Sequence, residues 1–160
     1  MARSKPENIY TTGADFARMF GRMEHALKRS GYLKADRKDA QADWAAYAKS
    51  LGAPFFDMVV ANGIAKTLIG EPPRKLLADG LEWGPEHPAP LKNVAELIIE
   101  GVCRVRNSLI HGEKFVATGQ WERDGQLVRD AFAVLIAAAE FAGPIKESNR
   151  PSQENARTKV

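Results

Sequence analysis

The chain has 160 residues, with 23 Lys and Arg against 20 Asp and Glu, giving a formal net charge of +3. This length fits one domain whose core is large enough to fold without disulfides or a metal. The single cysteine excludes a disulfide framework within the chain, and no apolar run reaches the roughly 18 residues of a membrane span. We therefore expect a cytoplasmic protein without membrane association, whose mild positive charge permits a nucleic-acid partner without requiring one.

The first half of the chain predicts three helices. Residues 1–12 are polar and are expected to form a flexible arm, and a helix then begins near Asp15 and ends at Gly31. Residues 33–39 are a charged connection to a second helix, which starts at Asp39 or Ala40 and ends at Gly52. A third helix begins at Pro54, and Asn62-Gly63 is able to bend or split it.

The second half alternates a loop-rich segment with two further helices. Residues 70–90 are punctuated by proline and glycine, so we expect loop there apart from one short helix over residues 74–81. A long helix over about residues 91–110 carries an apolar stripe at helical spacing, and the last helix spans about residues 125–141. Residues 144–160 are low in hydrophobics and are expected to be disordered. The prediction is an all-α, up-and-down bundle of four or five main helices over residues 13–143.

The end of the 91–110 helix carries the residues best suited to chemistry. Arg106, Asn107 and His111 bring a guanidinium, an amide and an imidazole into its last two turns. Metal-free RNA cleavage needs a group that moves protons near neutral pH, which histidine supplies. It also needs a permanently charged donor for the phosphoryl oxygens, which arginine supplies. Asn107 would orient the histidine or hold a phosphate oxygen. On spacing alone, however, such a trio is more often a capping and surface arrangement, and the helix dipole would also favour His111 there.

Other chemistries have little support in the sequence. His25, His87 and His111 show no metal-ligand spacing with the single cysteine, so no metal site is expected. The chain has no phosphate-binding loop, dinucleotide fingerprint or nucleophile elbow, so no cofactor is expected.

The segment RNSLIHG (residues 106–112) resembles the Arg-(Asn/Asp/His)-x3-5-His signature of HEPN-domain ribonucleases in its spacing and its place at a helix end. The segment FARMFGRMEHAL (residues 16–27) also looks like the first helix of small HEPN proteins. The resemblance implies a compact bundle, a dimer that joins two motifs in one cleft, and metal-independent RNA cleavage leaving a cyclic phosphate. Arg106 and His111 would be catalytic, and Glu24 would steady one of them. Many HEPN proteins are toxins of toxin–antitoxin pairs or act in phage defence.

Two alternatives to the enzyme stay open. The first is a HEPN module without catalysis, since some family members have lost it, which dimerises and binds a protein partner such as an antitoxin. A second apolar strip of Ile99, Cys103 and Ile110 on the 91–110 helix suits a second copy or such a partner. The other alternative is a helical bundle unrelated to HEPN, in which Arg106 and His111 are surface residues. A further mode of control in the family, modification of a tyrosine two residues after the histidine, is not supported because Glu113 stands there.

Overall fold

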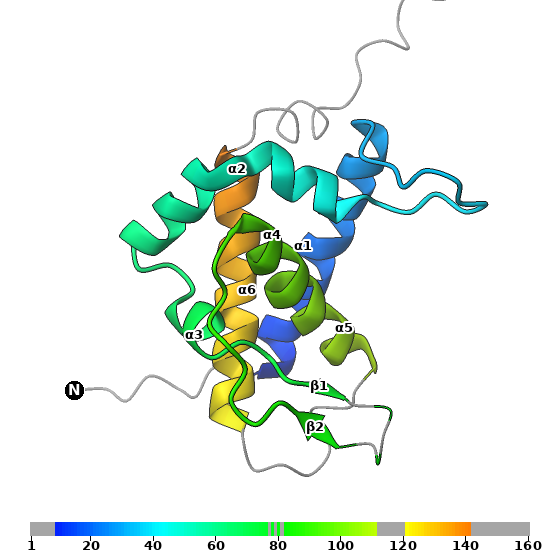
Figure 1. Ribbon diagram of the computed structural model, residues 1–160. Coiled ribbons are helices and arrows are strands. Elements are labelled where there is room, and N and C mark those ends of the chain that lie inside the picture. Colours follow the sequence, from blue (N-terminus) through cyan, green and yellow to red (C-terminus); the bar gives the residue numbers. More distant parts are fainter. Residues whose placement is uncertain (1–8, 77, 79, 81, 112–120, 142–160) are drawn as a thin grey trace, which may run out of the picture.

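The computed structural model describes residues 9–76, 78, 80, 82–111 and 121–141, and most of these residues are helical, which confirms the predicted all-α bundle. Helix α6 (Trp121–Phe141) runs through the middle and packs against α1 (Ile9–Arg29), α2 (Trp44–Ala61) and α3 (Lys66–Gly70) (Figure 1). The helix formed by α4 (Val94–Glu96), η1 (Leu97–Cys103) and α5 (Arg104–His111) packs against the same bundle. A two-residue antiparallel ladder of β1 (Lys75–Leu76) and β2 (Trp83–Gly84) lies at one side.

One hydrophobic core joins all the long helices. Its largest fully buried side chains come from α1, α2, α3, η1 and α6, in that order along the chain: Phe16, Met23, Leu27, Tyr47, Phe55, Val59, Leu68, Leu97, Ile98, Leu127 and Leu135. Burying a side chain of this size contributes about 1.5–3 kcal/mol relative to leaving it in water. Among the described helices, none is both long enough and apolar enough to cross a lipid bilayer.

Helix α1 ends where the sequence predicts and begins earlier. At its end, Gly31 adopts a left-handed φ of 92°, and the Tyr32 N–H donates to the Leu27 carbonyl at 2.9 Å, as in a Schellman motif. At its start, the expectation of a flexible arm over residues 1–12 is wrong for residues 9–12, because the helix begins at Ile9 rather than Asp15. Thr12 is buried and Gly13 lies against Leu109, so packing on the bundle extends the helix backwards. Residues 1–8 lie outside the described part of the chain.

Helix α2 begins later than predicted and contains a kink. Its N-cap is Asp43, whose carboxylate accepts from the Ala46 N–H at 3.0 Å, whereas Asp39 and Ala40 precede the helix. A bridge between Leu33 and Ala42 holds residues 33–42 in a hairpin-like loop, which competes with helix there. Gly52 has a φ of 72°, outside the helical region, so α2 is kinked at the point where the sequence predicts a break between two helices. The Asn62-Gly63 split is confirmed, since α2 ends before it and α3 starts at Lys66.

The expected short helix over residues 74–81 is wrong. Lys75 and Leu76 are extended and pair with Gly84 and Trp83. Prolines flank this segment on both sides, and they fix φ and remove backbone donors, which favours extended and turn structure over a helical turn. Among the described residues outside this ladder, residues 71–90 are loop, as predicted.

The helix that carries the motif is interrupted by a π-helical segment. It begins at Val94 rather than Leu91, with Asn93 as N-cap accepting from the Glu96 N–H at 2.9 Å. The seven residues of η1 then follow before α-helical geometry returns at Arg104. The predicted apolar stripe is buried along η1 and at Val105, while Leu109 packs partly against the core. π-Helical turns are rare and occur often near functional sites.

Helix α6 caps α3 through a buried carboxylate. The N-cap position of α3, Ala65, has no side chain able to accept a hydrogen bond, and the Leu68 N–H instead donates to Asp130 Oδ2 at 3.0 Å. Gln126 Nε2 donates to the other oxygen at 2.7 Å, and Asp130 is only 7% exposed. The last helix itself starts at Trp121, four residues before the predicted Gly125, and its end at Phe141 agrees with the prediction.

Replacing Asp130 by alanine should lower the free energy of unfolding by about 1–3 kcal/mol, because the buried Leu68 N–H would lose its acceptor. Asp130→Asn should lose less, because its amide oxygen still accepts one of the two hydrogen bonds. Urea unfolding measures both losses, with Asp57→Ala as the control, since Asp57 is exposed on α2. A loss no greater than that of Asp57→Ala would mean that Asp130 does not cap α3.

Candidate functional site

Arg106 lies where α5 meets α1, and α1 holds its side chain. The guanidinium Nη2 lies 3.6 Å from Glu24 Oε1, and the two side chains are 33% and 26% exposed. At this exposure solvent screens the ion pair, so its net contribution to stability is expected to be about 1 kcal/mol or less. Its effect is therefore mainly to orient the guanidinium. The sequence predicts that Glu24 would steady either Arg106 or His111, and the structure brings its side chain to Arg106.

An aromatic ring supports the same guanidinium. The Arg106 carbon Cζ lies 5.1 Å from the centroid of the Phe20 ring, a cation–π distance. Phe20 is buried and stacks on Trp44 with the ring centroids 4.6 Å apart. Phe20 and Glu24 are four residues apart on α1, so one flank of that helix supplies both contacts. The arginine is thus positioned before any ligand arrives.

Asn107 and His111 follow on the same helix. Arg106 Nη1 donates to Asn107 Oδ1 at 3.2 Å, and Asn107 is exposed. His111 is the last residue of α5, and its side chain lies outside the described part of the structure. Five residues of α-helix separate the Arg106 and His111 backbones, a rise of about 7.5 Å and a rotation of about 140°. Within one copy, the two residues therefore leave the helix in different directions.

Cys103 lies one helical turn before Arg106, and the charged groups around it shift the pKa of its thiol. Burial, and after it the nearby Glu24 carboxylate, raise the pKa of its thiol from 9.0 to about 12, against the opposing effects of Arg106 and Lys34. The thiol therefore stays protonated at neutral pH and is a poor nucleophile. These influences also indicate that Lys34 lies near the same face as Arg106 and Glu24.

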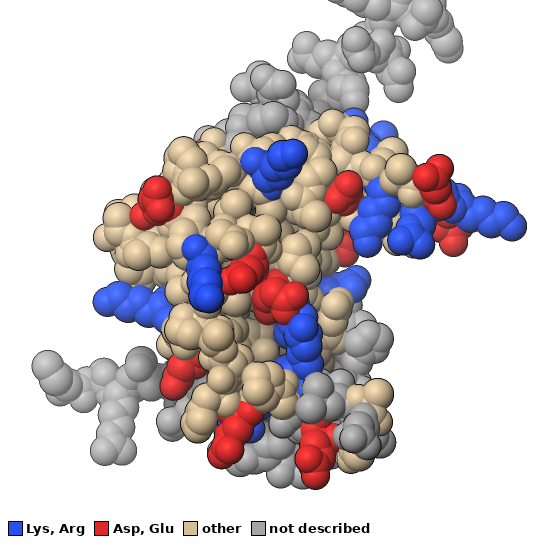
Figure 2. Space-filling view, in the orientation of Figure 1, with Lys and Arg blue, Asp and Glu red and all other residues tan. Residues whose placement is uncertain are grey.

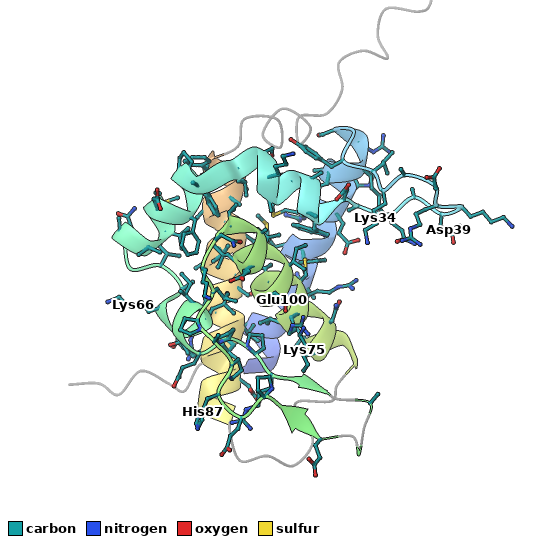
Figure 3. All side chains as sticks on the ribbon, viewed as in Figure 1. Lys34, Asp39, Lys66, Lys75, His87 and Glu100 are labelled. Carbon is teal, nitrogen blue, oxygen red and sulfur yellow. The ribbon has the colours of Figure 1, made fainter. Side chains whose placement is uncertain are left out.

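The exposed face of α1 is rich in cations, and at about 100° per residue it lies about 150° around the helix from the flank that carries Phe20 and Glu24. Arg18, Arg22, His25 and Arg29 are exposed and follow each other at helical spacing along the outer face of α1. Two of these arginines have partners on the same helix. Arg18 lies 3.8 Å from Asp15, and Arg29 Nε donates to His25 Nε2 at 2.7 Å. The loop after α1 projects from the bundle with lysines and arginines among acidic residues (Figure 2). Lys34 lies nearer the bundle on this loop than Asp39 does (Figure 3).

The second apolar strip is only partly available for a partner. Ile99 and Cys103 are partly buried and pack against the chain's own core, and the Ile110 side chain lies outside the described part of the structure. Sequence reasoning missed Phe20 as a support for Arg106. The signal was its position four residues before Glu24, since both then lie on one flank of the helix.

Within the described residues, no three His, Cys, Asp or Glu side chains gather closely enough to hold a metal ion. His87 is exposed on the loop before α4, far along the chain from the other histidines (Figure 3). Comparison with known proteins found no matching family model, no matching curated protein and no matching solved structure.

Proposed function

We propose that this protein is a metal-independent endoribonuclease of the HEPN type, in which Arg106 and His111 are the catalytic residues. The observation that carries the proposal is the Arg106 guanidinium, which is held by Glu24, Asn107 and Phe20 at the end of a helix whose last residue is the motif histidine. We further propose a cytoplasmic location, and a toxin or phage-defence role remains a prediction from the HEPN resemblance.

The chemistry of Arg106 fits transition-state stabilisation. A guanidinium has five N–H donors, and the contacts with Glu24 and Asn107 engage only two of its nitrogens, each through one oxygen. The remaining donors can bind two phosphoryl oxygens as charge develops on them. Preorganisation matters because an arginine that is already oriented loses less side-chain entropy when the phosphate binds. Glu24 and Phe20 act here as positioning residues rather than as reacting groups.

The chemistry of His111 fits proton transfer. An imidazole can take the proton of a 2′-hydroxyl, which then attacks the adjacent phosphate, displaces the 5′-oxygen and leaves a 2′,3′-cyclic phosphate. The 5′-oxygen must gain a proton as it leaves, and the protonated imidazole of the second copy's His111 would donate it. Because Arg106 and His111 leave one helix about 140° apart, we propose that two copies of the chain form a composite cleft, with both residues of each copy facing the substrate.

Cleavage of a mixed RNA pool by the purified protein in EDTA tests the proposal. We expect cleavage to persist in the chelator and to leave 2′,3′-cyclic phosphate ends, because neither histidine nor arginine needs a metal for this reaction. Loss of activity in EDTA that added magnesium restores would contradict the metal-independent mechanism. Absence of cleavage with and without metal would contradict the enzyme and favour the second candidate described below.

The basic face of α1 yields a prediction about RNA binding. Arg22→Gln with Arg29→Gln should weaken binding of a single-stranded RNA and reduce the slope of log K against log salt by about 1.4, since each phosphate contact contributes about 0.7. Fluorescence anisotropy at several salt concentrations measures this slope. Lys49→Gln with Lys66→Gln removes the same charge from α2 and α3 and should leave the slope unchanged; Lys66 lies on the opposite side from Lys34 (Figure 3). Equal slopes in both double variants would mean that α1 does not contact phosphates.

A second candidate function is a HEPN-like module that binds a protein partner without catalysis. It is favoured by one observation: the Arg106 side chain already has an acidic and an aromatic partner on α1, which is also what a structural tie between α1 and α5 requires. In that case Arg106→Ala would lower the stability of the fold and no RNA would be cleaved. The enzyme and the module therefore differ in whether wild-type protein cleaves RNA at all.

A further inference from the structure

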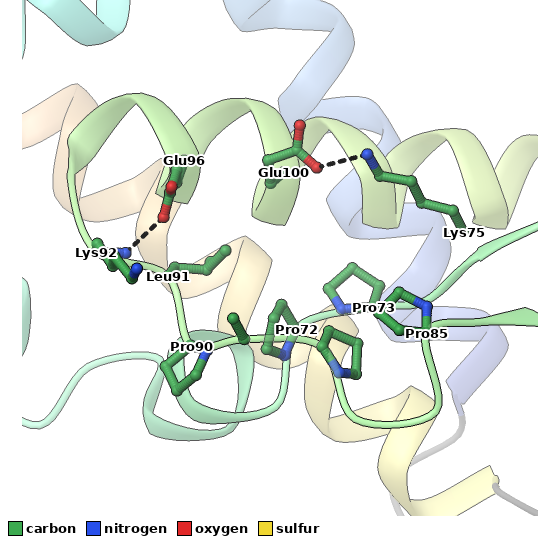
Figure 4. A pocket seen from close by; sticks show the side chains of 11 residues that line it. Pro72, Pro73, Lys75, Pro85, Pro90, Leu91, Lys92, Glu96 and Glu100 are labelled. Carbon is green, nitrogen blue, oxygen red and sulfur yellow. Dashed lines mark hydrogen bonds and ion pairs between the residues drawn. The ribbon is translucent and has the colours of Figure 1, made fainter.

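A pocket lies away from the Arg106 cluster, between the loop of residues 72–92 and the first turns of the motif helix. Its volume is about 370 Å³, within the range of cavities that hold small ligands. One wall is made by Glu96 and Glu100 and the other by five prolines, with Lys75 and Lys92 among its lining residues (Figure 4). The prolines are Pro72, Pro73, Pro85, Pro88 and Pro90.

The proline wall restricts what can bind. Proline fixes its own φ angle, so this wall is preformed and loses little freedom when a ligand enters. Proline also lacks a backbone N–H, so these five residues offer apolar ring faces and no donors from their nitrogens. Leu91 extends the apolar surface, and its N–H is already bonded to the Ile69 carbonyl at 2.9 Å. The wall therefore suits the apolar body of a ligand, such as a flat ring.

The two carboxylates of the pocket are already engaged in the fold. Glu96 Oε2 accepts from the Lys92 N–H at 2.7 Å at the start of the helix. Glu100 Oε2 accepts a short hydrogen bond from Arg104, and the Lys75 ammonium lies 3.5 Å from the same oxygen. Arg104 alone can neutralise Glu100, and its contact is the closer of the two. Lys75 is the exchangeable partner, with its side chain 52% exposed.

The charges of the pocket residues indicate which polar group a ligand would carry. Because Arg104 keeps Glu100 paired when Lys75 leaves it, the ammonium groups of Lys75 and Lys92 can turn to a ligand, and they favour an anion. Glu100 also lies at the centre of η1, and π-helical segments of this kind occur often at functional sites. We propose that this pocket binds a small molecule that carries an apolar ring and a carboxylate. The ring lies on the prolines, and the carboxylate replaces Glu100 as the partner of Lys75.

Three probes of the same ring and different charge test this assignment on the full chain: benzoate, benzyl alcohol and benzylamine. Titrations followed by amide chemical shifts in NMR spectra report both affinity and the place of binding. We expect benzoate to bind most tightly and to shift the amides of Lys75, Leu91 and Glu100. Tighter binding of benzylamine than of benzoate would overturn the assignment, as would the absence of shifts at these residues with all three probes.

Two substitutions should change the benzoate affinity in opposite directions. Lys75→Met should weaken it about tenfold, the effect of losing one hydrogen bond to a charged group. Glu100→Gln should tighten it, because Lys75 would lose its competing partner inside the protein. Lys49→Met, on the exposed surface of α2, is the matched control and should change nothing. Unchanged affinity in Lys75→Met would overturn the proposal, and the same spectra show whether each variant is folded. None of these outcomes depends on RNA cleavage.

Discussion

Replacing His111 by alanine should lower the rate of RNA cleavage by about 10²–10⁴-fold, the typical contribution of a positioned acid or base. His111 is the last residue of α5, and urea unfolding of the variant shows whether its fold is intact. The chain offers a matched control in His87→Ala, because His87 is exposed on a loop outside the motif. Rates are measured on one labelled RNA with both variants and the wild type in the same buffer.

Arg106 can be tested beside His111 by measuring both RNA cleavage and stability, which separates a catalytic role from a structural one. Arg106→Ala should reduce cleavage by a similar factor, whereas Glu24→Gln should reduce it less, because Glu24 only orients the guanidinium. Urea unfolding of each variant shows whether loss of activity follows loss of stability. If His111→Ala and Arg106→Ala both cleave at the wild-type rate, neither residue is catalytic and the proposed enzyme is wrong.

Cys103 should react with iodoacetamide about a thousandfold more slowly than a cysteine with the ordinary pKa. The pKa of its thiol is raised from 9.0 to about 12 by burial and by the Glu24 carboxylate, and only the thiolate is nucleophilic. A shift of this size lowers the thiolate fraction by three powers of ten at any pH below the ordinary pKa. The same chain unfolded in urea is the internal control and should react at the ordinary rate. Equal rates in the folded and unfolded chains would mean that the thiol is neither buried nor close to Glu24.

Substitutions at Glu24 and at Arg106 should change the rate of Cys103 alkylation in opposite directions. Glu24→Gln removes a charge that raises the pKa of the thiol, so alkylation should become faster, and Arg106→Gln removes a charge that lowers the pKa, so it should become slower. A change of the same sign in both variants would contradict the arrangement of Glu24, Arg106 and Cys103.

The raised pKa of the Cys103 thiol also sets how the stability of the fold changes with pH. Between pH 9.0 and about 12 the unfolded chain releases the thiol proton that the folded chain retains, so stability falls as pH rises through this window.

Local physical signals were enough to predict most of the helices. The apolar spacing in α1, the Gly31 cap, the break at Gly52 and the split at Asn62-Gly63 all depend on residues close together in the sequence, and each is confirmed. The errors occur where contacts with a distant segment of the chain set the end of a helix. Helix α1 extends back to Ile9 because it packs on the bundle, and α2 starts only at Trp44 because Leu33 pairs with Ala42.

For the candidate site, the sequence by itself determined the residue types and their spacing: a guanidinium at Arg106, an amide beside it and an imidazole at the end of the same helix. Only the tertiary structure decided what surrounds Arg106. The contacts with Glu24 and Phe20 join positions about 80 residues apart in the chain, and no periodicity within one helix specifies which flank of another it meets. The proline pocket arises in the same way, because it depends on how the loop of residues 72–92 packs against the motif helix. Helical spacing is a local property, whereas the partner of each side chain is set by packing in the bundle.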